Sequence, residues 1–332
     1  MPPKRPTGPR RPGPPPAGQP RDRRGFGDPP RRRAAPEDKP DRPPRGAGPR
    51  DPRGDRPDAR RAGGPGRPET VSAARPAEQP RESLPREGNG VIWLHGLHAV
   101  AAAIGNPRRR LRRLLLTAEA EENLLARLPP GTLAARKLQP ERVEDRTRFH
   151  SFLPEDSVHQ GAALLAEPLP GIALDDALRA SDGPVLLLDQ VTDPRNVGAI
   201  LRCAAAFGAC AVVVQDRHAP PETGALARAA SGALEIVPMI REVNLARTIR
   251  HLQESGAWVM GLAGEAKRTL AEAKPTDRRA ALVLGAEGAG LRRLQRETCD
   301  ELVRLPIRPE MESLNVAAAA AVALYEIVRG AA

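Results

Sequence analysis

From Pro184 to the C-terminus, uninterrupted apolar runs alternate with helical segments, and this alternation limits the possible folds more than any other feature. Val185–Asp189 reads VLLLD and Ala211–Gln215 reads AVVVQ. Such runs are typical of strands buried on both faces. Further strands are expected at Leu234–Val237, Ala257–Ala263, Ala281–Gly285 and Leu302–Leu305, and helices at Val197–Phe207, Glu222–Ala230 and Asn244–Ser255. The order predicts an α/β domain over residues 184–332, with a parallel sheet, helices on both faces and ligands at the carboxyl ends of the strands.

The last of these units spans Leu302–Arg329. A short apolar strand leads into a polar, proline-containing turn at Pro306–Glu312, and an alanine-rich helix follows. Ser313 and Asn315 stand at the start of that helix, where their side chains can accept hydrogen bonds from its free amides. The same helix start can present amides to a ligand.

The first 90 residues differ sharply from the rest in composition. They hold 22 Lys and Arg against 12 Asp and Glu, 23 of the 38 prolines, and nearly all of the net charge of +11. Such a segment cannot bury enough apolar surface to offset its ordering entropy, so a disordered tail is expected. An Arg-rich tail attracts RNA through its phosphates. Phe26 is the only aromatic residue in it, so base stacking contributes little; the alternative is a solubilising extension without a partner.

Residues 91–167 predict a small α/β domain, followed by a linker at 168–183. Apolar Val91–Leu94 opens it. Strands are expected at Arg112–Thr117 and Gly161–Ala166, and helices at His98–Ile104, Ala118–Arg127 and Pro140–Thr147. A basic cluster precedes and enters one strand (Arg108, Arg109, Arg110, Arg112 and Arg113). It is either a solvated loop or a second patch that contacts phosphate, and we slightly favour the patch.

The three cysteines, Cys203, Cys210 and Cys299, have no CxxC spacing. They predict reduced thiols of a cytoplasmic protein rather than a disulfide framework or a zinc site. The N-terminus lacks an apolar signal region, and no run of eighteen apolar residues occurs, so neither secretion nor a membrane span is expected.

Three loops that follow strands carry the candidate chemistry. The first contains Asn196, Gly198 and Arg202: Asn196 can cap a helix, Gly198 permits close approach, and Arg202 either faces a ligand or is an ordinary surface arginine. The second, Gly285–Leu291, has the spacing GxxGxG rather than the dinucleotide fingerprint GxGxxG, which argues against a dehydrogenase. The third is the helix start at Ser313-Leu314-Asn315.

Together these loops resemble the SpoU/TrmH branch of the SPOUT RNA 2′-O-methyltransferases. The matching pieces are Asn196-x-Gly198-x-x-x-Arg202, Leu284-Gly285-x-Glu287-Gly288-x-Gly290-Leu291 and Ser313-Leu314-Asn315-Val316. Residues 91–167 contain Gly96–Val100 and Val158–Gly161, which look like pieces of the family's small substrate-binding domain, similar to ribosomal L30e. After the last strand the family's Pro-x-x-Gly turn is replaced by Pro306-Ile307-Arg308-Pro309, and proline cannot adopt the positive φ open to glycine.

The resemblance implies a C-terminal trefoil knot, S-adenosyl-L-methionine as cofactor, a homodimer and no metal. It implies methylation of a ribose 2′-hydroxyl in RNA, most closely a guanosine of 23S rRNA. It assigns the cofactor pocket to Gly264, Gly285, Gly288, Leu305 and Leu314, and the acceptor site to Asn196, Arg202, Glu287, Ser313 and Asn315.

A guanidinium has a pKa above about 12 and stays protonated at neutral pH. Arg202 therefore suits the role of an electrostatic anchor better than that of a base. Glu287 or an RNA phosphate is then the proton acceptor. Two other functions remain open at this point: a tRNA ribose methyltransferase, and a non-catalytic RNA-binding protein on the same fold.

Overall fold

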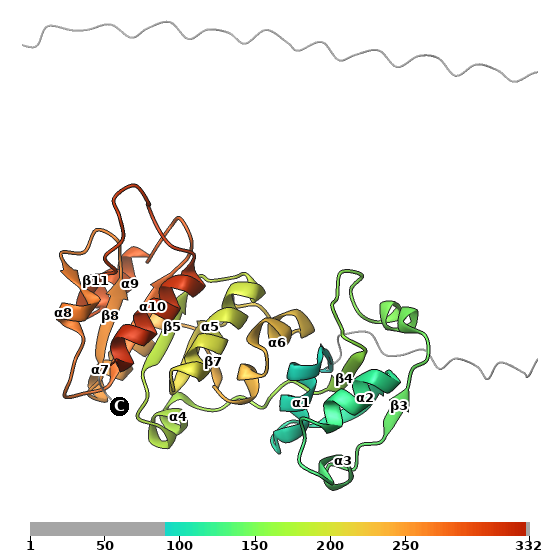
Figure 1. The fold of residues 1–332 in the computed structure, drawn as a ribbon. Coiled ribbons are helices and arrows are strands. Elements are labelled where there is room, and N and C mark those ends of the chain that lie inside the picture. Colours follow the sequence, from blue (N-terminus) through green and yellow to red (C-terminus); the bar gives the residue numbers. More distant parts are fainter. Residues whose placement is uncertain (1–89, 330–332) are drawn as a thin grey trace, which may run out of the picture. The chain divides into compact units, whose positions relative to one another are not determined.

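The computed structural model describes residues 90–329, which contain two sheets (Figure 1). The first has the order β1-β4-β2-β3, formed by β1 (Ile92–His95), β2 (Leu111–Leu116), β3 (Pro140–Arg142) and β4 (Ala162–Ala166). Strand β4 is antiparallel to both of its neighbours, and β3 is parallel to β2. Helices α1 (Leu97–Gly105), α2 (Ala118–Leu125) and α3 (Thr132–Ala135) belong to the same part of the chain, which we call the N-terminal module (residues 90–167).

The helix expected at Pro140–Thr147 is wrong. Pro140 instead begins β3 and pairs with Leu114, and a 3₁₀ helix follows at Arg146–Ser151. Proline is tolerated as the first residue of an edge strand because its missing N–H then costs no ladder bond. Pairing with β2 outweighs the local helical preference.

The second sheet has seven strands in the order β7-β6-β5-β10-β8-β11-β9, and every pair is parallel, as the sequence predicts. Its strands are β5 (Val185–Asp189), β6 (Ala211–Gln215), β7 (Met239–Glu242), β8 (Trp258–Leu262), β9 (Arg268–Thr269), β10 (Ala280–Gly285) and β11 (Glu301–Arg304). Its helices are α5 (Pro194–Ala206), α6 (Gly224–Ala230), α7 (Leu245–Glu254), α8 (Leu270–Ala273), α9 (Arg293–Thr298) and α10 (Val316–Val328). We call this part, residues 184–329, the catalytic module, because it contains the three loops that the sequence predicts to carry the chemistry.

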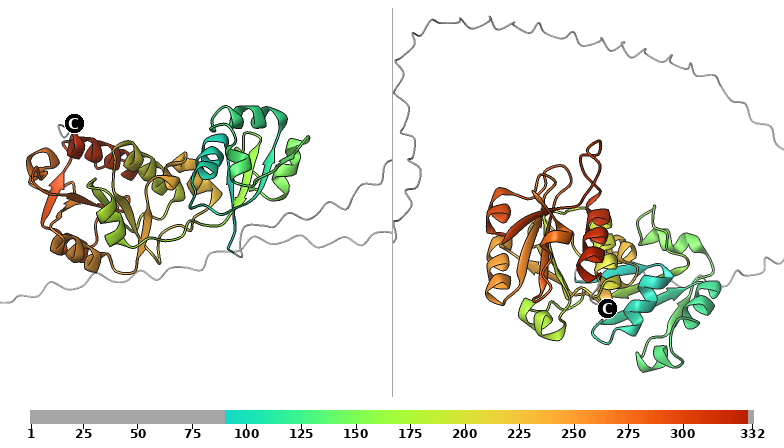
Figure 2. Two further views of the ribbon diagram at one scale, coloured as in Figure 1. Left: turned by 90° about the horizontal axis from the view of Figure 1, so that it is seen from below. Right: turned by 60° about the vertical axis from the view of Figure 1, so that its left-hand side comes forward.

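Helices cover both faces of the second sheet (Figure 2). Along β5, Leu186 and Leu188 pack in one cluster with residues of α5, α6 and α10, whereas Val185 and Leu187 pack in another with residues of α4 (Leu174–Ala180) and α7. Alternate residues of one strand therefore support two separate cores, which explains why the strand is apolar throughout.

Two further expectations need correction. The segment 168–183 contains α4, whose buried Leu174 and Ala177 belong to the catalytic module's core, so it is not a simple linker. The strand expected at Leu234–Val237 is a 3₁₀ turn (Ala233–Glu235), and β7 begins only after Pro238. Gly232, with φ 92°, turns the chain before this segment, and the proline after it delays the strand.

The expected disorder of residues 1–90 falls, apart from Gly90, outside the described residues. Within residues 90–329, no helix has the length and apolar character that a membrane crossing requires.

Candidate functional site

Three polar side chains from the three candidate loops meet at the carboxyl end of the second sheet. Asn315 Nδ2 donates to Glu287 Oε1 over 2.6 Å and to Asn196 Oδ1 over 3.1 Å, and Asn196 Nδ2 donates to Glu287 Oε1 over 3.2 Å. The backbone amide of Val316 also donates to Glu287 Oε1, over 3.3 Å. The sequence prediction that these loops converge is confirmed within a single chain.

Local helix chemistry places the two asparagines. Asp193 caps α5 by accepting from the amide of Arg195, Pro194 occupies the first turn, and Asn196 therefore lies in that turn. Asn315 caps α10: its Oδ1 accepts from the amides of Ala317 and Ala318, which leaves Nδ2 to reach the other two residues.

The glycine-rich loop after β10 turns back on itself, so that Glu287 stands at its tip. Gly288 and Gly290 have φ of 78° and 63°, a region that side chains with a Cβ rarely adopt. A Cβ on Gly285 would lie 2.1 Å from the carbonyl carbon of Gly290. Gly288 and Gly290 thus make the turn, and Gly285 leaves room for the loop to close.

A cavity of about 500 Å³ adjoins this network. Backbone and small or apolar side chains form most of its wall. The sequence-predicted residues that line it are Gly264, Gly285, Glu287, Gly288, Leu305, Ser313 and Leu314. All five residues expected to bind a cofactor therefore share one cavity, and Glu287 belongs to both the cavity and the polar network.

Arg202 does not join the network. It is exposed on α5 and has no hydrogen bond or ion pair to a described residue. Gly198 is buried, and a Cβ there would lie 2.8 Å from the carbonyl oxygen of Leu226 in α6. Its role in the single chain is helix packing, not contact with a ligand.

The sequence analysis assigned no role to Asp189, which is fully buried at the end of β5. It accepts from the backbone amide and Nε of Arg292, over 3.0 and 2.8 Å, and Arg292 also donates to Gln215 over 3.0 Å. These bonds fasten the end of the glycine-rich loop to β5 and β6. The sequence signal that could have revealed this role is the single carboxylate at the end of an otherwise apolar strand.

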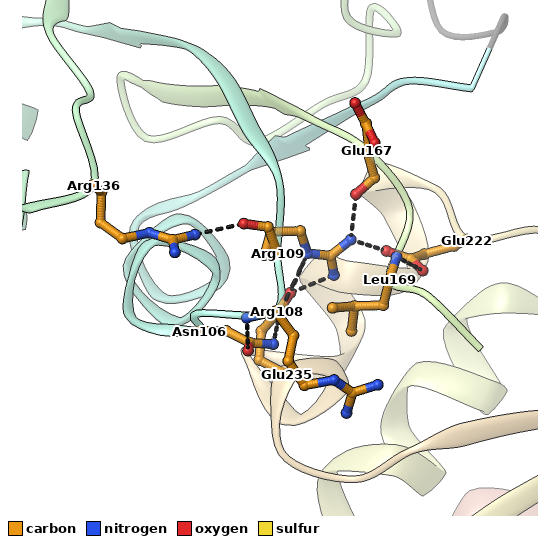
Figure 3. A network of polar contacts seen from close by, with 8 residues as sticks. All are labelled: Asn106, Arg108, Arg109, Arg136, Glu167, Leu169, Glu222 and Glu235. Atoms are coloured by element: carbon orange, nitrogen blue, oxygen red, sulfur yellow. Dashed lines mark hydrogen bonds and ion pairs between the residues drawn. The ribbon is translucent and has the colours of Figure 1, made fainter. Parts of the chain in front are cut away.

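Acidic side chains pair with four of the five arginines in the basic cluster of the N-terminal module. Arg109 is 1% exposed and pairs with Glu222 and Glu235 (Figure 3). Arg110 and Arg112 pair with Glu167 but stay exposed, so a phosphate contact through them stays a prediction. Arg113 forms two 2.8 Å bonds to Glu141 and holds the pKa of that carboxyl below its usual value.

Within residues 90–329, no group of three or more His, Cys, Asp or Glu side chains has the arrangement of a metal site. All three cysteines are free thiols. Burial, with Asp300 and Asp189 nearby, raises the pKa of Cys299 to about 12, so this side chain is a protonated thiol at neutral pH.

Comparisons with known proteins agree with this geometry. Residues 183–325 match the model of the SpoU rRNA Methylase family. The 23S rRNA (guanosine-2′-O-)-methyltransferase RlmB of Vibrio vulnificus is 39% identical over 245 residues, which cover 71% of this chain and 96% of that protein. The chain belongs to the SpoU family. RlmB of Escherichia coli K12 is 40% identical, with 97% of its length covered.

Solved structures show the same fold. The SpoU methyltransferase AviRb from Streptomyces viridochromogenes, in complex with AdoMet, has a TM-score of 0.59 at 23% identity, covering 72% of this chain and 90% of that one. A putative TrmH-family RNA methyltransferase from Porphyromonas gingivalis has a TM-score of 0.58 at 25% identity, with the same coverage.

Proposed function

We propose that this SpoU-family chain methylates a ribose 2′-hydroxyl of RNA, with a guanosine of 23S rRNA as the target and S-adenosyl-L-methionine as the methyl donor. One observation carries the proposal: the Asn196–Glu287–Asn315 network lies at the rim of a glycine-walled cavity of about 500 Å³. The 23S rRNA guanosine methyltransferases that are 39–40% identical over nearly their whole length support the choice of substrate.

The cavity suits the proposed cofactor. Its volume lies within the range of about 300–1,000 Å³ typical of small-molecule sites. Leu262, Leu284 and Leu314 offer apolar contact for a purine ring, and Glu312 offers a carboxylate to a cation. Glu265, in the same wall, is paired with Arg296. When bound, S-adenosyl-L-methionine supplies an electrophilic methyl group that the reaction transfers to a ribose oxygen.

Within this proposal, Glu287 accepts the proton of the 2′-hydroxyl. All three hydrogen bonds to this carboxylate use Oε1, and Oε2 has no partner among the described residues. Oε2 is thus the available acceptor, while Oε1 keeps the side chain in place. Asn196, Asn315 and Ser313 position the ribose at the cavity rim.

Arg202 serves as an electrostatic anchor for the developing alkoxide or the adjacent phosphate. It is exposed, it lies on the same helix as Asn196, and no described carboxylate neutralises it. Because a guanidinium remains protonated, it contributes charge rather than proton transfer.

Further features of the family extend the proposal. The insertion of β10 between β5 and β8 supports a knotted catalytic module, and the mixed sheet β1-β4-β2-β3 supports an L30e-like module that binds RNA. Val322 and Tyr325 expose apolar surface on α10, which supports a homodimer. We place the enzyme in the cytoplasm, and we propose that the basic tail at 1–90 adds RNA affinity.

A methylation assay with 23S rRNA fragments and labelled S-adenosyl-L-methionine tests the function. Wild-type chain should transfer methyl to a guanosine ribose, and Arg202→Ala should lower kcat by about 10²-fold or more. Arg202→Lys should recover part of this loss because it keeps the charge. Methyl transfer to tRNA alone would contradict the assignment of 23S rRNA as the substrate. Near-normal turnover in both variants would show that Arg202 has no part in the mechanism.

A further inference from the structure

The most deeply buried ionic network among the described residues joins the two modules. The Arg109 side chain is 0% exposed, and its two carboxylate partners, Glu222 and Glu235, are 11% and 6% exposed. Burial disfavours the charged guanidinium, but the bonds to Glu235 and Glu222 outweigh this and raise the pKa of Arg109. Arg109 is therefore a permanent cation between two carboxylates.

This network ties together three segments that are distant in the sequence (Figure 3). Arg109 donates to the carbonyl of Glu167 over 2.9 Å, at the end of the N-terminal module. Glu222 accepts from the amide of Leu169 over 3.1 Å, and Glu235 accepts from Asn106 Nδ2 over 2.7 Å. The catalytic module thus supplies both carboxylates, and the N-terminal module and the segment after it supply the donors.

Close packing continues from this network to the candidate active site. A Cβ on Gly224, at the start of α6, would lie 2.2 Å from the carbonyl oxygen of Trp93 in β1. On its other side α6 packs against α5, where Gly198 leaves no room for a Cβ. Helix α6 therefore lies directly between the N-terminal module and the helix that carries Asn196.

We propose that Arg109 is a positioning residue: with Glu222 and Glu235 it fixes the N-terminal module on the catalytic module, so that RNA held by the first is presented in one register to the second. The inference rests on the proposed function for its RNA substrate. An ionic network that is shielded from water suits this role, because salt screens it little and its geometry is directional.

The test removes all three charges together, since removing one would leave an unpaired buried charge. In the full chain, Arg109→Met with Glu222→Gln and Glu235→Gln should replace one cooperative calorimetric unfolding transition by two, because the modules then unfold separately. The Kd for S-adenosyl-L-methionine should stay within about twofold, whereas the KM for rRNA should rise by about tenfold or more. This triple variant is more positive than wild type by one charge. Non-specific attraction to RNA would therefore lower the KM for rRNA rather than raise it.

The control is Arg278→Met with Asp277→Asn, which removes a 2.9 Å ion pair of the catalytic module, just before β10 and outside the junction. It should keep a single transition and the wild-type KM. Should the triple variant fail to fold, Arg109→Lys provides the second test: one ammonium cannot span both carboxylates, and an intermediate KM is expected.

A single transition together with an unchanged KM for rRNA would overturn the inference. If the wild-type chain methylates no RNA, the proposed function is wrong, and so is the part of the inference in which the N-terminal module presents RNA to the catalytic module. The number of unfolding transitions would still decide whether Arg109 joins the modules.

Discussion

At the scale of single residues, Glu287 has two tasks that its two oxygens divide. Oε1 receives donors from Asn196, Asn315 and the amide of Val316, so it holds the start of α10 against the first turn of α5. A glutamine at this position keeps one acceptor oxygen but cannot take up a proton. The two tasks can therefore be separated by one conservative substitution.

Glu287→Gln should lower kcat for RNA methylation by about 10²- to 10⁴-fold, the usual contribution of a general base. The Kd for S-adenosyl-L-methionine should change by no more than a few-fold, because the loop conformation depends on Gly285, Gly288 and Gly290. Single-turnover kinetics and calorimetry measure the two quantities. A near-normal kcat would restrict Glu287 to holding the helix and leave an RNA phosphate as the acceptor.

The buried side chain of His95 should make the free energy of unfolding depend on pH. Its burial, with Arg228 nearby, lowers the pKa of this imidazole to about 4, and its Nδ1 has no hydrogen-bond partner among the described residues. In the unfolded chain the pKa of His95 is near 6.5. Between pH 4 and 6.5 the unfolded chain therefore binds more protons than the folded one, and stability rises with pH across this window. The contribution is complete above about pH 6.5, and up to about 3 kcal/mol is lost as the pH falls to 4.

Urea unfolding at several pH values from about 7.5 to 4.5 checks this. The stability difference between wild type and His95→Gln should shrink as the pH falls, because glutamine does not titrate. His98→Gln, at an exposed position of α1, is the control. Parallel pH profiles for wild type and His95→Gln would show that His95 does not control the acid limb.

At the scale of elements, the close approach that Gly198 permits is between helices α5 and α6. Gly198 in the Asn196-x-Gly198 spacing faces α6, where a Cβ would lie 2.5 Å from Ala229 Cβ and 2.9 Å from the amide of Ala230. The same spacing places Asn196 at the sheet edge, so the motif combines one packing residue with one site residue.

Gly198→Ala should destabilise the chain by about 1–3 kcal/mol, the usual cost of overpacking. Gly105→Ala should be neutral or stabilising by up to about 1 kcal/mol, because Gly105 is exposed at the end of α1 and a Cβ there meets nothing within 4 Å. Thermal unfolding compares the two variants. Equal effects would contradict the steric argument, since helix propensity favours alanine at both positions.

The strands most accurately predicted from sequence were those buried on both faces. Val185–Asp189 and Ala211–Gln215 have the predicted bounds because an apolar run of that length has few alternatives. The helix predicted at Pro140–Thr147 is wrong because this segment pairs with a strand far along the chain, at Leu114. The strand predicted at Leu234–Val237 is wrong because Gly232 turns the chain before it and Pro238 delays the strand until Met239.

The same limit applies to the site. Asn196, Glu287 and Asn315 were found because each follows a strand end, and parallel strands bring those ends together. Arg109 was misread, and Asp189 was given no role, because the partners that bury these charges, Glu235 and Arg292, lie more than a hundred residues away. Sequence reveals a charge but not the residue that neutralises it.

At the scale of the whole molecule, charge and fold are divided between different parts of the chain. Residues 91–332 carry a net charge of only +1, and many of their arginines are held in ion pairs such as Arg112–Glu167 and Arg268–Glu301. The tail carries the remaining +10. Under the proposed function we therefore expect the tail to supply long-range attraction to RNA, and the shape of the site with a few exposed cations to select the ribose.

Deletion of residues 1–89 should therefore weaken rRNA binding and flatten its salt dependence. Each lost phosphate contact lowers the slope of log K against log salt by about 0.7–0.9, so the loss of several contacts is easily measured between about 50 and 200 mM salt. A full-length chain with the tail arginines changed to glutamine separates charge from length, and it should behave like the deletion. The kcat at saturating RNA should stay near wild type in both, because the Asn196–Glu287–Asn315 network and its cavity lie within residues 90–329. An unchanged salt slope would show that the tail does not contact RNA, and a collapse of kcat would show that it acts at the catalytic site.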